Sequence, residues 1–330
     1  MLQGPIVRWG LFALLVLVGG GSVLATDAAA SDHPTIRAES AIVVDAVTGQ
    51  VLFDKNASTQ LPPASLTKLF TAFAALEVAD LNQQMTVAPA DLVGEASMGL
   101  TAGEVLPFEA LLYGMLLPSG NDAASTVARN LSGSSTEGTA AGDDAFMAYL
   151  NGRIADLGLN GTRLENPHGL DQEGHVSTAY DIAKLTIYAM ATEPAFAQAI
   201  AATSYSRFGH QLQQTNELHG NYPGLIGGKT GVTREAGYSL MEVAERDGRR
   251  VVVVLLGSTA EAWYADARAL LDYGFTALAT PGAPVYGQIT FQPAPVEVPG
   301  AAGSLTVSQA SAEAAIVSVP ASISPQPQPA

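Results

Sequence analysis

Hydrophobic positions along the chain form short β-branched runs near both ends of its central region and apolar, Ala-rich runs between them. The short runs predict strands and the longer runs predict helices. Turn residues at 45–49 predict a hairpin, and Asp247-Gly248 predicts a turn between the last two strands. The predicted strands cover 41–44, 51–53, 228–233, 237–244 and 249–257, and the predicted helices cover 65–78, 107–116, 122–129, 145–157, 178–191 and 263–273. This order predicts an α/β fold, with an antiparallel sheet flanked by helices and an inserted helical lobe.

The two ends of the chain have a different composition. Arg8 and the apolar run 9–25, followed by small residues, predict a secretory signal at 1–30. The run is just short of a comfortable bilayer span, so an uncleaved anchor is the alternative. Residues 33–278 are expected to form the main domain. Residues 279–330, rich in Pro, Ala and Ser, predict a flexible tail or a small β-module.

Composition narrows the classes of partner. The formal net charge of −16 over 330 residues argues against nucleic acid and anionic membrane surfaces, because both attract basic patches. Membrane contact is therefore expected only through an uncleaved N-terminal segment. The chain has no cysteine, which excludes disulfides, thiolate metal sites and a cysteine nucleophile. Whether or not the predicted signal is cleaved, the body of the protein is expected to be exported, in an extracellular or periplasmic location or at the outer face of the membrane.

The most informative stretch begins at Pro62 and Pro63, which precede an apolar, Ala-rich run and predict a helix start. Ser65 then lies in the first helical turn, and Lys68 follows three residues later on the same face. The spacing pairs a nucleophilic hydroxyl with an amine that can take its proton. The backbone N–H of Ser65 is also an unpaired donor at a helix start, so it can stabilise the oxyanion that its own attack creates.

Two further motifs follow. Ser119-Gly120-Asn121 interrupts two predicted helices, and Lys229-Thr230-Gly231 lies on a predicted strand. Each of the three motifs occurs once, and two of the four lysines lie within them. Their order and their placement at a helix start, a loop and a strand make a chance coincidence improbable.

These motifs resemble those of the serine D-alanyl-D-alanine carboxypeptidases, the low-molecular-mass penicillin-binding proteins, which share a β-lactamase/transpeptidase-like fold with class A β-lactamases. The resemblance covers about residues 40–275 and makes residues 33–278 a transpeptidase-like catalytic domain. The matching segments are Pro63-Ala64-Ser65-Leu66-Thr67-Lys68, Leu117-Pro118-Ser119-Gly120-Asn121-Asp122-Ala123, His168-Gly169-Leu170-Asp171 and Gly228-Lys229-Thr230-Gly231 with Thr233 and Ala236-Gly237-Tyr238.

The resemblance implies that the protein trims peptidoglycan stem peptides ending in D-Ala-D-Ala. Ser65 attacks the penultimate D-alanine carbonyl, Lys68 takes its proton, and an acyl-enzyme forms. Ser119 and Lys229 relay the proton to the leaving D-alanine, and Asn121 hydrogen-bonds the substrate backbone. No metal and no cofactor is expected.

The strand motif is expected to bind the substrate. Thr230 and Lys229 face the terminal carboxylate, and Gly231 lets a substrate strand approach the sheet edge. The N–H of Val232 is expected to complete the oxyanion hole. β-Lactam antibiotics are expected to inhibit by acylating Ser65. One departure concerns the carboxylate, because many members carry an arginine just before the last helix, where this chain has Trp263-Tyr264.

Three alternatives stay open. A class A-like β-lactamase would need a deacylating glutamate, and the only Glu-x-x-x-Asn pair here is Glu217 and Asn221. A non-catalytic cell-wall-binding protein is the second alternative, which the intact motif set argues against. His168 and His175 invite a Ser-His triad or a metal site, but no matching elbow or ligand spacing accompanies them. His168 is expected to shape the loop beside the pocket.

Overall fold

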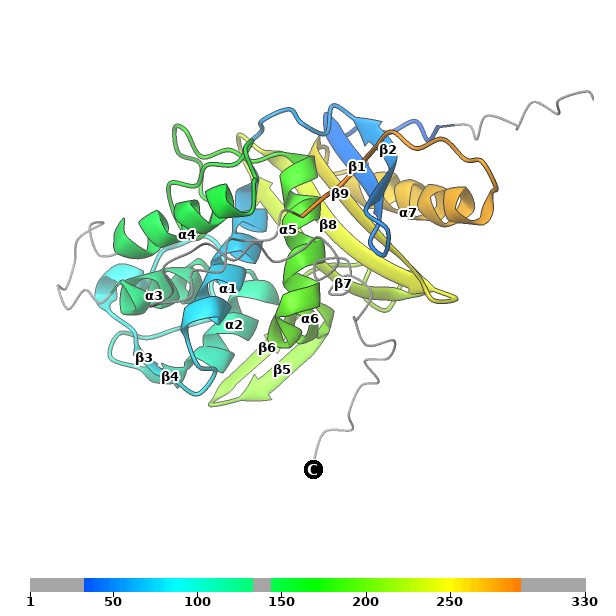
Figure 1. Ribbon diagram of the computed structural model, residues 1–330. Coiled ribbons are helices and arrows are strands. Elements are labelled where there is room, and N and C mark those ends of the chain that lie inside the picture. Colours follow the sequence, from blue (N-terminus) through cyan, green and yellow to red (C-terminus); the bar gives the residue numbers. More distant parts are fainter. Residues whose placement is uncertain (1–32, 133–143, 292–330) are drawn as a thin grey trace, which may run out of the picture. The chain divides into compact units, whose positions relative to one another are not determined.

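The protein is described by a computed structural model over residues 33–132 and 144–291 (Figure 1). The predicted signal at 1–30 lies outside the described residues. The strands are β1 Ser40–Asp45, β2 Gln50–Lys55, β3 Gln84–Thr86, β4 Val105–Pro107, β5 Ser204–Arg207, β6 His210–Gln213, β7 Leu225–Thr233, β8 Gly237–Arg246, β9 Arg249–Ser258 and β10 Gly287–Gln288. The helices are α1 Thr67–Val78, α2 Phe108–Leu116, α3 Asn121–Leu131, α4 Asp144–Asp156, α5 Ala179–Thr192, α6 Pro194–Ala201 and α7 Trp263–Ala279, with 3₁₀ turns η1 Ala64–Leu66 and η2 Pro89–Asp91.

A six-stranded antiparallel sheet has the order β10-β2-β1-β9-β8-β7. The predicted hairpin over 41–54 is confirmed as β1 and β2, and the predicted three-strand meander is confirmed as β7, β8 and β9. Because β1 pairs with β9, the first strands and the last strands of the domain close into one sheet. β7, which carries the Lys-Thr-Gly motif, lies at one edge.

Alternation along the central strands divides their side chains between two cores. Val43, Val251 and Val253 pack with α7, whereas Ile42, Val252 and Val254 pack with the helical lobe that includes α5. This two-residue period places successive side chains on opposite faces, so a strand that is apolar throughout is buried on both. Figure 1 shows α7 on one face of the sheet and α5 on the other.

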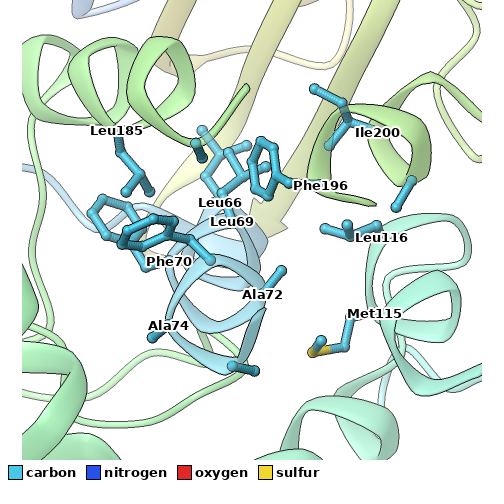
Figure 2. Packing of buried hydrophobic residues seen from close by; sticks show 14 of the residues in the cluster. Leu66, Leu69, Phe70, Ala72, Ala74, Met115, Leu116, Leu185, Phe196 and Ile200 are labelled. Atoms are coloured by element: carbon cyan, nitrogen blue, oxygen red, sulfur yellow. The ribbon is translucent and has the colours of Figure 1, made fainter. Parts of the chain in front are cut away.

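Helix α1 is the centre of the larger core. Residues 67–75 are all buried, so the helix is enclosed on every side rather than along one stripe. Figure 2 shows its side chains meeting residues from α2, α5 and α6, among them Met115, Leu185 and Phe196. The rigid packing of α1 fixes the position of the η1 turn at its N-terminus.

Helix α7 is longer than predicted. We expected it to end before Gly274, but it continues to Ala279. A Cβ built on Gly274 would lie 2.8 Å from side-chain carbons of Val43 and Val251. The glycine therefore permits a close approach of helix and sheet, and it is not a C-terminal cap.

The described chain continues past α7 along the β2 edge of the sheet. Residues 279–330 were predicted to form a flexible tail or a small β-module, and within them β10 pairs with β2 and Ile289 is buried. Residues 292–330 lie outside the described residues, and the division of the chain at 278 stays a prediction. No described helix is both long and apolar enough to span a membrane.

Candidate active site

Ser65 lies in the η1 turn and not, as predicted, in the first turn of an α-helix. The pairing with Lys68 survives this change, because residues three apart eclipse one another in a 3₁₀ turn. Lys68 Nζ lies 2.9 Å from Ser65 Oγ, 2.7 Å from Asn121 Oδ1 and 2.7 Å from the carbonyl oxygen of His168. Ser65 is half-buried and Lys68 is fully buried.

The surroundings of Lys68 favour its neutral form. Burial lowers the pKa of the amine well below its usual value, and the nearby positive charge of Lys229 lowers it further, against the opposing charges of Asp122 and Glu95. A neutral amine has two N–H bonds and one lone pair. Asn121 Oδ1 and the His168 carbonyl can only accept, so they take both N–H bonds and leave the lone pair for the Ser65 hydroxyl.

A second serine and lysine meet beside this pair. Lys229 Nζ donates to Ser119 Oγ at 2.8 Å and to the carbonyl of Thr230 at 2.8 Å. Burial lowers the pKa of Lys229 to about 7. Ser119 has a φ of 66°, a left-handed conformation that a serine keeps only when its surroundings hold it there. The structure thus brings together two hydroxyls, two amines and one amide from η1, α1, the loop between α2 and α3, α3 and β7.

Asn121 connects the site to the loop 94–100. Its Oδ1 accepts from Lys68, and its Nδ2 donates to the carbonyl of Gly94 at 2.7 Å. The next residue, Asp122, accepts from the backbone N–H groups of Met98 and Leu100. These contacts fix the amide orientation, which places oxygen toward the lysine and nitrogen toward the loop.

The strand motif lies at the β7 edge of the sheet. Thr230 Oγ1 lies 3.2 Å from Thr215 Oγ1, and Val232 is exposed. A Cβ on Gly231 would come within 3.1 Å of Ser65 N and of Pro63 O. The missing Cβ was expected to make room for a substrate strand, but the structure shows it making room for the turn that carries Ser65.

The two histidines of the loop between α4 and α5 do not form a triad with Ser65. His175 Nε2 contacts Thr67 Oγ1, and its Nδ1 accepts from the N–H of Glu165. His168 contributes its backbone carbonyl to Lys68, and its Nδ1 accepts from the N–H of Leu170. Within residues 33–132 and 144–291, no three metal-binding side chains gather into a site.

Sequence reasoning missed several groups that complete the site. The His168 carbonyl is a backbone atom, so no side-chain pattern marks it. Thr215 follows a polar hairpin with no motif, and the loop that holds Gly94 matches none of the three motifs. Asp122 was part of a quoted motif, but its spacing gave no indication that it anchors a loop.

The site pairs a serine with a buried lysine at a helix start. A second serine, from the loop between α2 and α3, pairs beside them with a lysine of β7. This arrangement defines an acylating serine enzyme of the penicillin-binding type. Residues 27–260 match the family described as D-alanyl-D-alanine carboxypeptidase, peptidase S11. The chain is 38% identical over 249 residues to D-alanyl-D-alanine carboxypeptidase DacB2 of Mycobacterium tuberculosis, covering 72% of this chain and 82% of that protein. It is 32% identical over 276 residues to the D-alanyl-D-alanine carboxypeptidase of Streptomyces sp. strain K15, covering 78% and 94%.

A solved structure has the same fold. The crystal structure of a D-alanyl-D-alanine carboxypeptidase from Mycobacterium tuberculosis H37Rv superposes with a TM-score of 0.70 at 36% identity, covering 78% of this chain and 97% of that one. The chain belongs to the D-alanyl-D-alanine carboxypeptidase family of serine peptidases. The resemblance inferred from the motifs and the predicted α/β fold are both confirmed.

Proposed function

We propose that the protein removes the terminal D-alanine from peptidoglycan stem pentapeptides through an acyl-enzyme on Ser65. The observation that carries this proposal is the contact of Lys68 Nζ, at 2.9 Å, with Ser65 Oγ in a site whose burial lowers the pKa of the amine. Among the described residues no carboxylate forms an ion pair with Lys68, so no such partner holds the amine in its charged form.

Acylation begins when Ser65 Oγ attacks the carbonyl carbon of the penultimate D-alanine and its proton passes to Lys68 Nζ. The oxyanion accepts hydrogen bonds from the N–H groups of Ser65 and Val232. Ser119 Oγ, which accepts from Lys229, then gives its proton to the leaving nitrogen and regains one from the lysine pair. The C–N bond breaks, D-alanine departs, and water later cleaves the serine ester.

Recognition of the terminal carboxylate is assigned to the β7 edge. Lys229 supplies positive charge, and the hydroxyls of Thr230 and Thr215 lie close enough together to donate to one carboxylate. Trp263-Tyr264 stand where many members of the family carry an arginine, so the carboxylate is assigned to these two hydroxyls and Lys229 instead.

Penicillins should acylate the same serine, and water should hydrolyse the resulting penicilloyl ester slowly. Their strained amide resembles the D-Ala-D-Ala bond, but the retained ring blocks the path that water needs. Glu217, the only candidate for a deacylating glutamate, is exposed, and its backbone N–H donates to Tyr264 on α7. The side chain of Asn221 donates to the Glu217 carbonyl, so neither residue is held against Ser65 by these contacts.

We place the enzyme outside the cytoplasm, at the cell wall or the outer face of the membrane. Cross-linkable stem peptides occur there, and the predicted signal at 1–30 supports export. Cell-wall organisation and cell shape are the processes that such trimming would affect.

The test is release of free D-alanine from a pentapeptide ending in D-Ala-D-Ala, together with labelling by a fluorescent penicillin. The wild-type protein should do both, and Ser65→Ala should do neither while keeping the wild-type melting temperature. Labelling that persists in Ser65→Ala would reject the assigned nucleophile. Rapid penicillin hydrolysis that Glu217→Gln abolishes would show a β-lactamase, and binding without any D-alanine release would show a non-catalytic wall-binding protein.

A further inference from the structure

The peptide group between Ala64 and Ser65 contains both a fixed carbonyl and the N–H assigned to the oxyanion hole. The group is planar and trans, so the direction of the Ala64 C=O determines the direction of the Ser65 N–H. The Ala64 oxygen accepts from Thr67 Oγ1 at 2.8 Å and also from the Thr67 backbone N–H. Thr67 thus holds the carbonyl oxygen of this peptide group, and the N–H of the same group faces the reacting carbonyl.

Thr67 is itself held by His175. The two side chains are 2.8 Å apart at Oγ1 and Nε2, and His175 Nδ1 accepts from the N–H of Glu165 at 3.0 Å. Since Nδ1 accepts, the neutral ring carries its proton on Nε2 and donates to Thr67. Donation then runs in one direction, from the Glu165 N–H through His175 and Thr67 to the Ala64 carbonyl.

Burial keeps this chain of hydrogen bonds intact. Thr67 is fully buried and His175 is 3% exposed, so water does not compete for either side chain. Burial also lowers the pKa of His175 to about 4, which leaves the ring neutral at physiological pH. A charged ring would carry a proton on both nitrogens and would set Nδ1–H against the N–H of Glu165.

The peptide needs such support because its backbone is strained. Ala64 has a φ of 49°, which a residue with a Cβ adopts only where the surrounding structure holds it. Gly169 also lies against this carbonyl, where a Cβ would overlap the Ala64 oxygen and come within 2.9 Å of Thr67 Oγ1. Gly169 and the Thr67 hydroxyl therefore both restrict the position of the oxygen.

We propose that His175 and Thr67 are positioning residues that aim the Ser65 N–H at the developing oxyanion. They do not touch the substrate, and they act by fixing and polarising the peptide group that does. Hydrogen bonds in series polarise one another, so the bonds accepted by the Ala64 carbonyl make the Ser65 N–H of the same peptide group a stronger donor. The inference rests on the proposed acyl-transfer function, because it concerns the same Ser65 N–H.

The experiment compares one substitution that removes the hydroxyl of Thr67 with one that keeps it. Thr67→Val keeps the shape and removes the Oγ1 donor, and Thr67→Ser keeps the donor. We expect Thr67→Val to lower kcat for the pentapeptide by about ten- to a hundredfold with KM within about threefold, because an oxyanion donor acts only in the transition state. Thr67→Ser should restore kcat to within about threefold of the wild type.

A merely structural role would give a different pattern. It would lower the melting temperature of Thr67→Val but leave kcat per folded molecule within threefold of the wild type, and that result would overturn the proposal. Binding of the peptide to Ser65→Ala and to the Ser65→Ala, Thr67→Val double variant should agree within about threefold, whereas a large difference would show ground-state binding and would also overturn it. If wild-type protein neither labels with penicillin nor releases D-alanine, the proposed function fails instead.

A measurement on the unmodified protein keeps the proposal testable if Thr67→Val does not fold. In ¹⁵N-labelled wild-type protein, the ring nitrogens of His175 should report a neutral ring protonated at Nε2 at pH 7. The resonance is assigned by substituting the other four histidines one at a time. A ring protonated at Nδ1, or a doubly protonated ring at pH 7, would break the chain of donors and reject the proposal.

Discussion

Replacing Asp122 with asparagine should destabilise the protein far more than an ordinary loss of a surface charge. Asp122 Oδ1 accepts from the N–H groups of Met98 and Ala123 at 3.0 and 2.9 Å. Its Oδ2 accepts from the N–H of Leu100 at 3.2 Å and from the Ser97 hydroxyl. The residue is 1% exposed, so the carboxylate is the acceptor that replaces water for these groups.

The size of the expected loss in unfolding free energy follows from the hydrogen bonds that the amide in Asp122→Asn cannot accept. One oxygen becomes an NH₂ group, which faces a buried backbone N–H and leaves it unpaired, at about 1–3 kcal/mol. The remaining bonds lose their charge and about half of their strength. The expected loss of unfolding free energy is about 2–4 kcal/mol.

The assay is urea unfolding followed by circular dichroism at pH 7, with Asp156→Asn as the matched control. Asp156 is 61% exposed and pairs with Arg153, which keeps Glu77 as a partner, so its replacement should change stability by less than about 0.5 kcal/mol. A loss below about 1 kcal/mol for Asp122→Asn, or equal losses for both variants, would refute the role of Asp122 as the anchor of the loop.

Three further predictions use other features. Gly274→Ala should destabilise the protein by about 1–3 kcal/mol, because the new Cβ of α7 would press against the sheet. Its control is Gly152→Ala on α4, whose Cβ would meet nothing within 4 Å and which should stabilise the protein by about 0.5–1 kcal/mol. A higher melting temperature for Gly274→Ala would contradict the packing argument. Burial raises the pKa of Glu242, so the folded state holds that proton more tightly than the unfolded state, and stability is lost as pH rises above about 4.5. Glu242→Gln should therefore raise the melting temperature more at pH 8 than at pH 5, and exposed Glu173→Gln should show no such difference. Finally, KM for the pentapeptide should rise between pH 7 and 9 as Lys229, with a pKa of about 7, loses its charge, and a flat KM would argue against its role in carboxylate binding.

The sequence predicted those parts of the molecule that depend on local patterns. The β-branched runs of β1 and β9 are buried on both faces, and their strand character needed no knowledge of the partners. Ser65 and Lys68 are three residues apart, so their contact follows from local geometry whether the turn is α or 3₁₀. The contact of Ser119 with Lys229, 110 positions apart, could be predicted only through the family resemblance.

Other parts depend on contacts that the sequence does not display. The hairpin of β5 and β6 is largely exposed and polar, so it lacks the alternation that marks a strand. Gly274 looks like a helix terminator until Val43 and Val251 are seen against it. The role of His175 depends on Thr67, which lies more than a hundred positions earlier and forms its contact across the fold.

The short strand β10 gives the two edges of the sheet opposite properties. Along β2, the N–H of Tyr286 donates to the carbonyl of Val51, and that of Ile289 donates to the carbonyl of Gly49. An unpaired edge with apolar side chains is a template for another extended chain. A protein cleaved before Tyr286 would present this template, and two such molecules could pair edge to edge and begin to aggregate. The last described residues thus cover the β2 edge, whereas no described strand covers the outer side of β7.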